Sequence, residues 1–277
     1  MKDVYEAVAE AVRGRETVAL ATIVQTRGST PRQVGTKMLI RGDGTIMGTV
    51  GGGALEAAII EAAQEALRQG KPRLVHYGLR ADQHEQDLGV CGGDLDVFID
   101  VVAPQATLLL IGAGHVAVPL AEMARMLRFR TIVFDDRAEY ANRDRFPQAD
   151  EVLVEEFEPG LRSLDITPNT WIVIATRSHE SDATALQAVV ESPAAYIGLL
   201  GSRRKVSLIF KALREAGVGE EQLARVYAPV GLDLGAETPE EIAVSIMAEM
   251  IMLRRGGEGR SLSARAEALQ RIQNRTD

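Results

Sequence analysis

Apolar residues in the first hundred positions follow patterns that predict a mixed α+β domain. Helical spacing predicts a helix over 3–13 that ends at Gly14, and the alanine-rich stretch 54–69, stopped by Gly70, predicts a second. Residues with high strand propensity predict five strands between and after these helices. These strands are 17–25, 37–40, 45–50, 74–79 and 95–102. The second and third flank a turn rich in glycine and aspartate, which indicates a hairpin.

From residue 107 onward, predicted strands and helices alternate as they do in a parallel sheet covered on both faces. The strands are predicted at 107–111, 131–135, 151–154, 171–175, 195–200 and 225–227. The last strong helix is predicted to run from Pro239 to about Arg254. Thr238 can cap it, proline suits its first position, and Glu241 can complete a capping box. Residues 261–277 are predicted to form a charged helical tail.

Length and composition favour two soluble domains with a small-molecule or protein partner. At 277 residues the chain is long for one core. Its net charge of -8 disfavours nonspecific binding to nucleic acid or to an anionic membrane. The start lacks a cationic region followed by an apolar one, and no apolar run is long enough to cross a bilayer, so we expect a cytoplasmic protein. The one cysteine, Cys91, cannot form an intrachain disulfide, which fits a reducing compartment.

A glycine-rich turn follows the strand predicted at 107–111. Gly112 allows a tight turn, Gly114 lets bare backbone approach a phosphate, and the helix that follows points its free N–H groups at that phosphate. Asp135, about 20 residues on, is placed to bind a ribose hydroxyl. Arg137 could accept a 2′-phosphate that this acid would repel, so the turn does not distinguish NAD from NADP. His115 either contacts ligand or faces solvent.

The same turn is also compatible with a doubly wound fold that binds no dinucleotide. Either way we predict a Rossmann-like doubly wound parallel sheet over 105–257, preceded by the α+β domain at 1–104 and followed by a tail at 258–277.

Two glycine segments of the first domain are candidate sites. Gly51, Gly52 and Gly53 lie between a strand and a helix, where they form either an anion cradle or a tight turn without ligand, and Glu56 complements the helix dipole. Cys91 precedes Gly92 and Gly93, in a turn where a thiol can be exposed and nearby N–H groups can stabilise a thiolate. A lone cysteine is otherwise a small buried hydrophobe. His84 gives no spacing for a zinc site.

Two more anion sites are predicted where strands of the second domain end. Ser202, Arg203 and Arg204 follow one strand and begin a helix, so cations and N–H groups converge there. Ser178 and His179 follow another strand at the edge where open α/β sheets bind ligands, and they either contact ligand or cap a helix.

Motif segments along the chain resemble one known family. In the first domain they are Gly28-Ser29-Thr30-Pro31-Arg32 with Gly35, the stretch 48–53 with Leu55-Glu56, and Cys91-Gly92-Gly93. In the second they are 112–117, Asp135-Asp136-Arg137, 176–179 with Asp182, 196–205, 229–235 and 238–243. Together they resemble the xanthine dehydrogenase accessory protein family, XdhC/CoxI, up to about Gly257.

The resemblance implies that the protein binds molybdenum cofactor (molybdopterin), shields it while a cysteine desulfurase supplies its terminal sulfur, and delivers it to a molybdenum hydroxylase. It also implies a phosphate cradle at 51–53 and a possible molybdenum contact at Cys91. We expect an accessory chaperone without turnover of its own, and a homodimer. An NAD(P)-dependent oxidoreductase and a nucleotide transferase acting on the cofactor phosphate remain alternatives.

The residues predicted to contact cofactor or nucleotide are Gly51, Gly52, Gly53, Cys91, Gly92, Gly93, Gly112, Gly114, His115, Asp135, Arg137, Ser178, His179, Ser202, Arg203 and Arg204.

Overall fold

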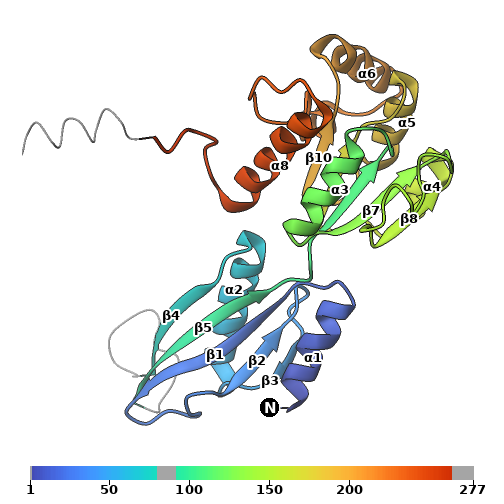
Figure 1. Ribbon diagram of the computed structural model, residues 1–277. Helices are drawn as coiled ribbons and strands as arrows, with labels where there is room; N and C mark the ends of the chain where they lie inside the picture. The colour runs from blue at the N-terminus through green and yellow to red at the C-terminus, as the bar shows by residue number, and fades with distance from the viewer. Residues whose placement is uncertain (1, 80–91, 264–277) are drawn as a thin grey trace, which may run out of the picture. The chain divides into compact units, whose positions relative to one another are not determined.

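The computed structural model describes residues 2–79 and 92–263, in two compact units that divide between Gln105 and Ala106 (Figure 1). The first unit holds a five-stranded sheet in the order β3-β2-β1-β5-β4, and every pair in it is antiparallel. Its strands are β1 (Val18–Arg27), β2 (Lys37–Ile40), β3 (Ile46–Gly48), β4 (Arg73–Gly78) and β5 (Asp94–Val102).

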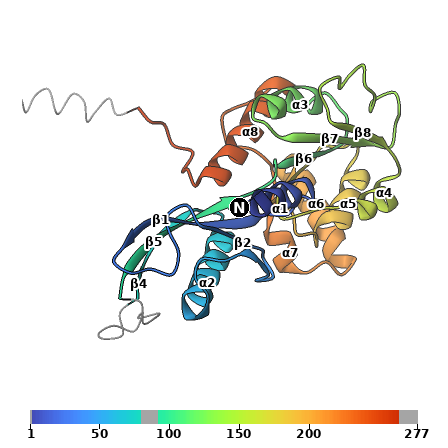
Figure 2. The same cartoon turned by 90° about the horizontal axis from the view of Figure 1, so that it is seen from below.

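Helices α1 (Lys2–Arg13) and α2 (Gly53–Gln69) cover opposite faces of this sheet (Figures 1 and 2). Side chains alternate between the faces of a strand. In β1, Ala19 and Ala21 therefore pack into the core beneath α2, whereas Val18 packs with α1. The predicted mixed α+β unit is confirmed.

The hairpin has a shorter second strand than predicted. The strand expected over 45–50 ends at Gly48, which has a φ of +88°, and glycines with positive φ follow it. A Cβ at Gly48 would lie 2.7 Å from the carbonyl oxygen of Lys37. Close packing against the neighbouring strand thus requires glycine here, and the positive φ turns the chain out of the sheet.

The second unit holds a six-stranded parallel sheet in the order β11-β10-β9-β6-β7-β8. Its strands are β6 (Thr107–Ile111), β7 (Arg130–Asp135), β8 (Glu151–Val154), β9 (Thr170–Ile174), β10 (Tyr196–Leu199) and β11 (Val226–Tyr227). The strand order reverses between β6 and β9. In an open α/β sheet, this reversal marks the crevice where ligands bind.

Helices cover both faces of this sheet (Figure 2). On one face, α3 (Ala117–Met126) packs with α8 (Pro239–Arg255). On the other lie α4 (Phe157–Ser163), α5 (His179–Val189), α6 (Arg203–Glu215) and α7 (Glu220–Ala224). The predicted Rossmann-like doubly wound sheet is confirmed. Among the residues described, no helix is long and apolar enough to cross a bilayer.

Candidate functional site

The glycine turn after β6 lies at the reversal point of the strand order. Gly112 has a φ of +103°, and a Cβ there would lie 2.2 Å from the carbonyl oxygen of Ala175 in the loop after β9. The two loops therefore touch, and only glycine fits between them. Gly114 is half-buried, and His115 is exposed in the turn just before α3.

Asp135, the predicted ribose ligand, is fully buried, and its carboxylate already accepts four hydrogen bonds. The amide of Ala113 donates to Oδ2 at 2.8 Å. Arg137 donates from Nε to Oδ1 at 2.9 Å, from its amide to Oδ1 at 3.1 Å and from Nη2 to Oδ2 at 3.1 Å. A carboxylate offers about four lone-pair sites. A ribose hydroxyl would have to displace one of these donors.

Burial by itself would raise the pKa of Asp135. The hydrogen bonds from Arg137 and from the amide of Ala113 outweigh that effect and lower the pKa below the ordinary value for aspartate. Asp135 and Arg137 therefore form a charged pair that fastens the glycine turn to the end of β7. Their predicted contact with a nucleotide stays a prediction.

An ion pair also joins the two loops that flank the glycine turn. The guanidinium of Arg177, after β9, meets the carboxylate of Asp136, after β7, in two hydrogen bonds of 2.7 and 2.8 Å. Because β6 lies between β7 and β9, this pair bridges the loops on either side of the switch point. An exposed pair of this kind contributes about 1 kcal/mol or less, so a ligand can displace it.

A pocket of about 510 Å³ lies where α5 and α6 begin. Ser178 caps α5 by accepting from the amide of Ser181 at 3.1 Å, and Ser202 caps α6 by accepting from the amide of Lys205 at 3.2 Å. The residues that line this pocket, which we call the α5–α6 pocket, are Arg177, Ser178, His179, Ser202, Arg204, Lys205 and Leu208. Two helix N-termini with their positive dipole ends therefore border one space, as anion sites require.

Asp182 fixes the geometry of this pocket. It is buried in the first turn of α5, and its Oδ1 accepts from the amide (2.9 Å) and hydroxyl (2.6 Å) of Thr176. Its Oδ2 pairs with the ammonium of Lys205 from α6. One carboxylate thus ties the loop after β9 to the first turn of α6. Asp182 belongs to the motif segments above, but its role was missed, because nothing local to that stretch indicates a lysine partner.

The basic side chains of the pocket differ in how far they are already engaged. Arg177 pairs with Asp136, Lys205 with Asp182, and the His179 Nε2 lies 3.0 Å from an oxygen of Glu180. Arg204 is exposed, and no hydrogen bond or ion pair is found for its guanidinium within residues 2–79 and 92–263. Arg204 is therefore the lining cation most available to an anion.

Arg203, predicted with its neighbour Arg204, is exposed at the start of α6 but does not line the pocket.

The glycine turn of the first unit holds a carboxylate of the chain itself. Gly51, Gly52 and Gly53 all have positive φ, as a tight turn demands. The Oε1 of Glu56 accepts from the amides of Val50 (3.1 Å) and Gly52 (2.9 Å) and from the Thr49 hydroxyl. One amide of the predicted phosphate cradle, that of Gly52, is thus bound to Glu56.

Burial would raise the pKa of Glu56, yet the hydrogen bonds from the Thr49 hydroxyl and from the amides of Gly52 and Val50 outweigh it, and the pKa is lowered. Glu56 is therefore ionised near neutral pH and occupies the turn as an anion.

The glycine motifs of the first unit lie together around the loop at 28–32. A Cβ at Gly93 would lie 2.3 Å from the carbonyl oxygen of Ser29, and one at Gly51 would lie 2.7 Å from the ring of Pro31. Gly92 follows directly on Cys91, the predicted molybdenum contact, which lies outside the described residues together with His84. Within the described ranges, no three His, Cys, Asp or Glu side chains gather as metal ligands.

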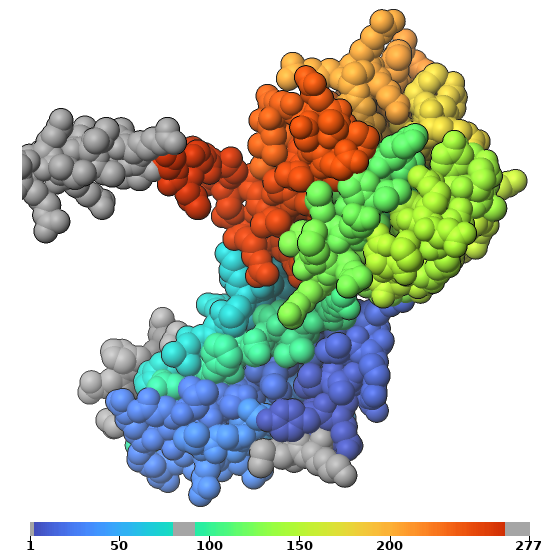
Figure 3. Space-filling model, viewed as in Figure 1, coloured from blue at the N-terminus to red at the C-terminus, as the bar shows by residue number. Residues whose placement is uncertain are grey.

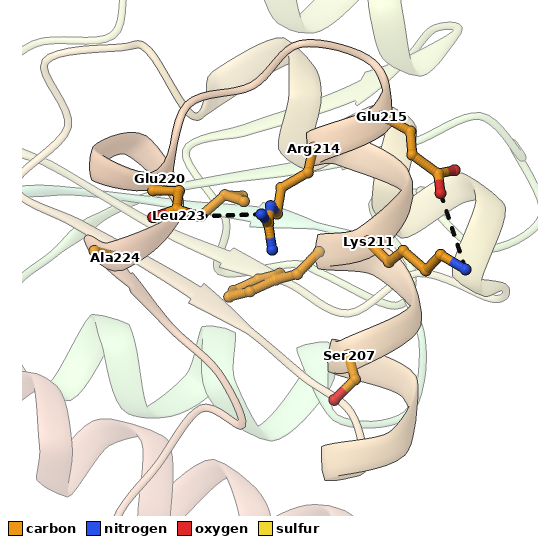
Figure 4. A pocket seen from close by; sticks show the side chains of 8 residues that line it. Ser207, Lys211, Arg214, Glu215, Glu220, Leu223 and Ala224 are labelled. Carbon is orange, nitrogen blue, oxygen red and sulfur yellow. Dashed lines mark ion pairs between the residues drawn. The ribbon is translucent and has the colours of Figure 1, made fainter.

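A second pocket, of about 720 Å³, lies between α6 and α7 (Figure 4). Its charged residues pair with each other: Arg214 lies 3.1 Å from Glu220, and Lys211 lies 3.9 Å from Glu215. Because these charges balance, this pocket is less suited to an anion than the α5–α6 pocket.

Comparison with known families identifies the chain. Its residues 108–250 match the model of the XdhC Rossmann domain, and residues 11–78 match the XdhC and CoxI family. The chain belongs to the XdhC and CoxI family. The resemblance drawn from the motifs is thereby confirmed.

Three relatives are similar over much of the chain. The uncharacterized protein YqeB of Escherichia coli is 44% identical over 87% of this chain, and a probable xanthine dehydrogenase subunit of Bacillus subtilis is 36% identical over 58% of it. The chain spans 44% and 46%, respectively, of the lengths of these two relatives. The molybdenum cofactor insertion chaperone PaoD of E. coli is 25% identical, and the match covers 88% of this chain and 86% of PaoD.

A crystal structure described as a xanthine dehydrogenase from Bacillus halodurans has the same fold. It superposes with a TM-score of 0.51 and 24% identity, over 94% of this chain and 97% of that one.

Proposed function

We propose that this protein binds molybdenum cofactor as cargo, supports its sulfuration by a cysteine desulfurase, and delivers it to a hydroxylase of the xanthine dehydrogenase type. One observation carries the choice of cargo: the similarity to PaoD, named as a molybdenum cofactor insertion chaperone, extends over most of both chains. The B. subtilis relative, named as part of a probable xanthine dehydrogenase, supports the class of client.

The α5–α6 pocket fits part of this cargo. The cofactor is a phosphorylated pterin, so a host needs N–H donors and cations for the phosphate and space for a flat ring. The N–H donors come from two helix N-termini, and the cations are the guanidinium of Arg204 and the ammonium of Lys205. The pocket volume of about 510 Å³ is within the range of small-molecule sites. Arg204 would bind the phosphate directly, while Asp182 and Lys205 hold the pocket in shape.

Cys91 remains the proposed contact to molybdenum. A thiolate is a soft ligand suited to this metal, and the family motif places it next to Gly92 and Gly93. In this proposal the protein holds the cargo and hands it over without a reaction of its own.

An NAD(P)-dependent oxidoreductase is the second candidate, favoured by the Rossmann turn at Gly112. The buried carboxylate of Asp135 weighs against it, because a ribose hydroxyl would have to displace one of the donors that this carboxylate already binds.

Anaerobic purification from a host that makes molybdenum cofactor separates the two candidates. The proposal predicts that the protein retains molybdenum and a pterin that becomes fluorescent on oxidation. Retention of NAD(P) without pterin would favour the oxidoreductase. The variant Cys91→Ala should lose molybdenum while its circular dichroism and thermal stability stay unchanged. Unchanged molybdenum retention would remove Cys91 from the proposal.

A further inference from the structure

Helix α8 exposes an apolar stripe on the side turned away from its own core. Its buried residues, which include Ala243, Ile246 and Met250, pack toward α3 and the sheet. On the opposite side, Val244 is 47% exposed and Ile251 is 44% exposed. Figure 3 shows α8 lying open on the surface of the second unit beside α3.

Opposite charges bracket this stripe at the two ends of the helix. Glu240, Val244, Ala248, Ile251 and Arg255 are spaced by three or four residues, so they share one side of α8. Glu240 and Arg255 are exposed, and neither has an ion pair within the part of the chain that the structure describes. They cannot pair with each other, because 15 residues of helix separate them by about 22 Å.

We propose that α8 is a dimerisation helix, which pairs antiparallel with α8 of a second copy of this chain. A two-fold axis between residues 247 and 248 would place Val244 of each copy against Ile251 of the other. The same axis would place each Glu240 against the other copy's Arg255. Ala248 would lie beside the axis, where its small side chain lets two helices approach closely. The pattern is self-complementary, which is what a two-fold interface requires.

The caps of α8 hold the stripe in place before any partner arrives. Thr238 and Glu241 form a capping box, Pro239 occupies the first turn, and Gly256 ends the helix in the left-handed conformation. Arg254 stacks over the ring of Phe129 within its own chain, at 5.0 Å. One helix pair is small beside the interfaces of permanent dimers, so we expect a reversible equilibrium between monomer and dimer.

Sedimentation velocity of the full chain over a concentration series tests this proposal. The wild type should shift from monomer to dimer as its concentration rises, and Val244→Glu and Ile251→Glu should stay monomeric. Glu240→Arg should weaken the dimer about tenfold, because two pairs become repulsive. The double variant Glu240→Arg with Arg255→Glu should restore the dimer. A restored dimer also shows that α8 still folds with its end charges exchanged.

The control changes an apolar side chain elsewhere that is more exposed than Val244 or Ile251. Leu74 on the edge strand β4 is 67% exposed, and Leu74→Glu should leave the dimer intact. Three results would each overturn the proposal: a wild type that is monomeric at every concentration, a dimer that survives Val244→Glu, or a charge reversal that fails to rescue Glu240→Arg. The last two would show that two copies do not meet through the α8 stripe.

Discussion

Replacing Lys205 with methionine should destabilise the second unit by about 2–3 kcal/mol. The change keeps most of the unbranched side chain but leaves the buried Oδ2 of Asp182 without its cation. Removing one partner of a fully buried ion pair costs about 3–5 kcal/mol. The Lys205 side chain is 29% exposed, so water can take over part of its role, and we expect a cost just below that range.

The single tryptophan of the chain makes this measurable. Trp171 lies buried in β9, so its fluorescence during urea unfolding follows the second unit alone. With a denaturant dependence of about 2 kcal/mol per molar urea, the midpoint should fall by about 1 M. Lys211→Met is the matched control on the same helix, where an exposed lysine 3.9 Å from Glu215 should contribute less than about 0.5 kcal/mol.

A double-mutant cycle separates the ion pair from the packing of the lysine stem. Lys205→Met combined with Asp182→Asn should be more stable than the sum of the two single effects predicts, by about 1–2 kcal/mol. If the two losses simply add, or if Lys205→Met behaves like the control, the pair does not hold the pocket together and our explanation of its geometry is wrong.

Three further predictions use the same fluorescence titration. Asp135→Asn should lower the free energy of unfolding by about 3 kcal/mol, because it leaves the half-buried Arg137 without its counter-charge. Since the pKa of Asp135 is lowered in the folded state, the ion pair should stabilise the wild type above about pH 4 and lose its effect as the pH falls below it; a difference between wild type and variant that does not change with pH would contradict this. Tyr196→Phe should cost about 1–3 kcal/mol, because the buried Glu249 loses a hydroxyl donor at 2.5 Å, and a neutral effect would mean that water replaces it. Gly112→Ala should cost about 2 kcal/mol or more through its positive φ and its contact with the next loop, so wild-type stability in this variant would show that the loops separate easily.

Periodicity predicted most of the fold, because the elements are governed by local rules. The capping box at Thr238 and the glycine stop at Gly256 confine α8 to nearly its predicted length. The strand expected over 45–50 ends earlier, at Gly48, because the backbone there packs closely against a neighbouring strand. No local sequence pattern encodes that contact.

The candidate site was predictable in its positions but not in its pairings. The motifs placed Asp135, Ser178 and Arg204 at the sheet edge where ligands bind. They could not show that Asp135 forms an ion pair with Arg137, that Asp182 of α5 pairs with Lys205 of α6, or that the carboxylate of Glu56 occupies the glycine turn. Each of these depends on which side chains the fold brings together, so each needed coordinates.

Equilibrium binding of molybdenum cofactor, released anaerobically from a purified molybdenum hydroxylase, is the most direct test of the proposed site. Arg204→Ser should weaken binding about tenfold to a hundredfold, the value of one hydrogen bond to a charged group. Arg214→Ser, at the other end of α6, removes the same charge from a residue already paired with Glu220 and should bind like the wild type. Equal binding by Arg204→Ser and the wild type would contradict the assignment of the cofactor to the α5–α6 pocket.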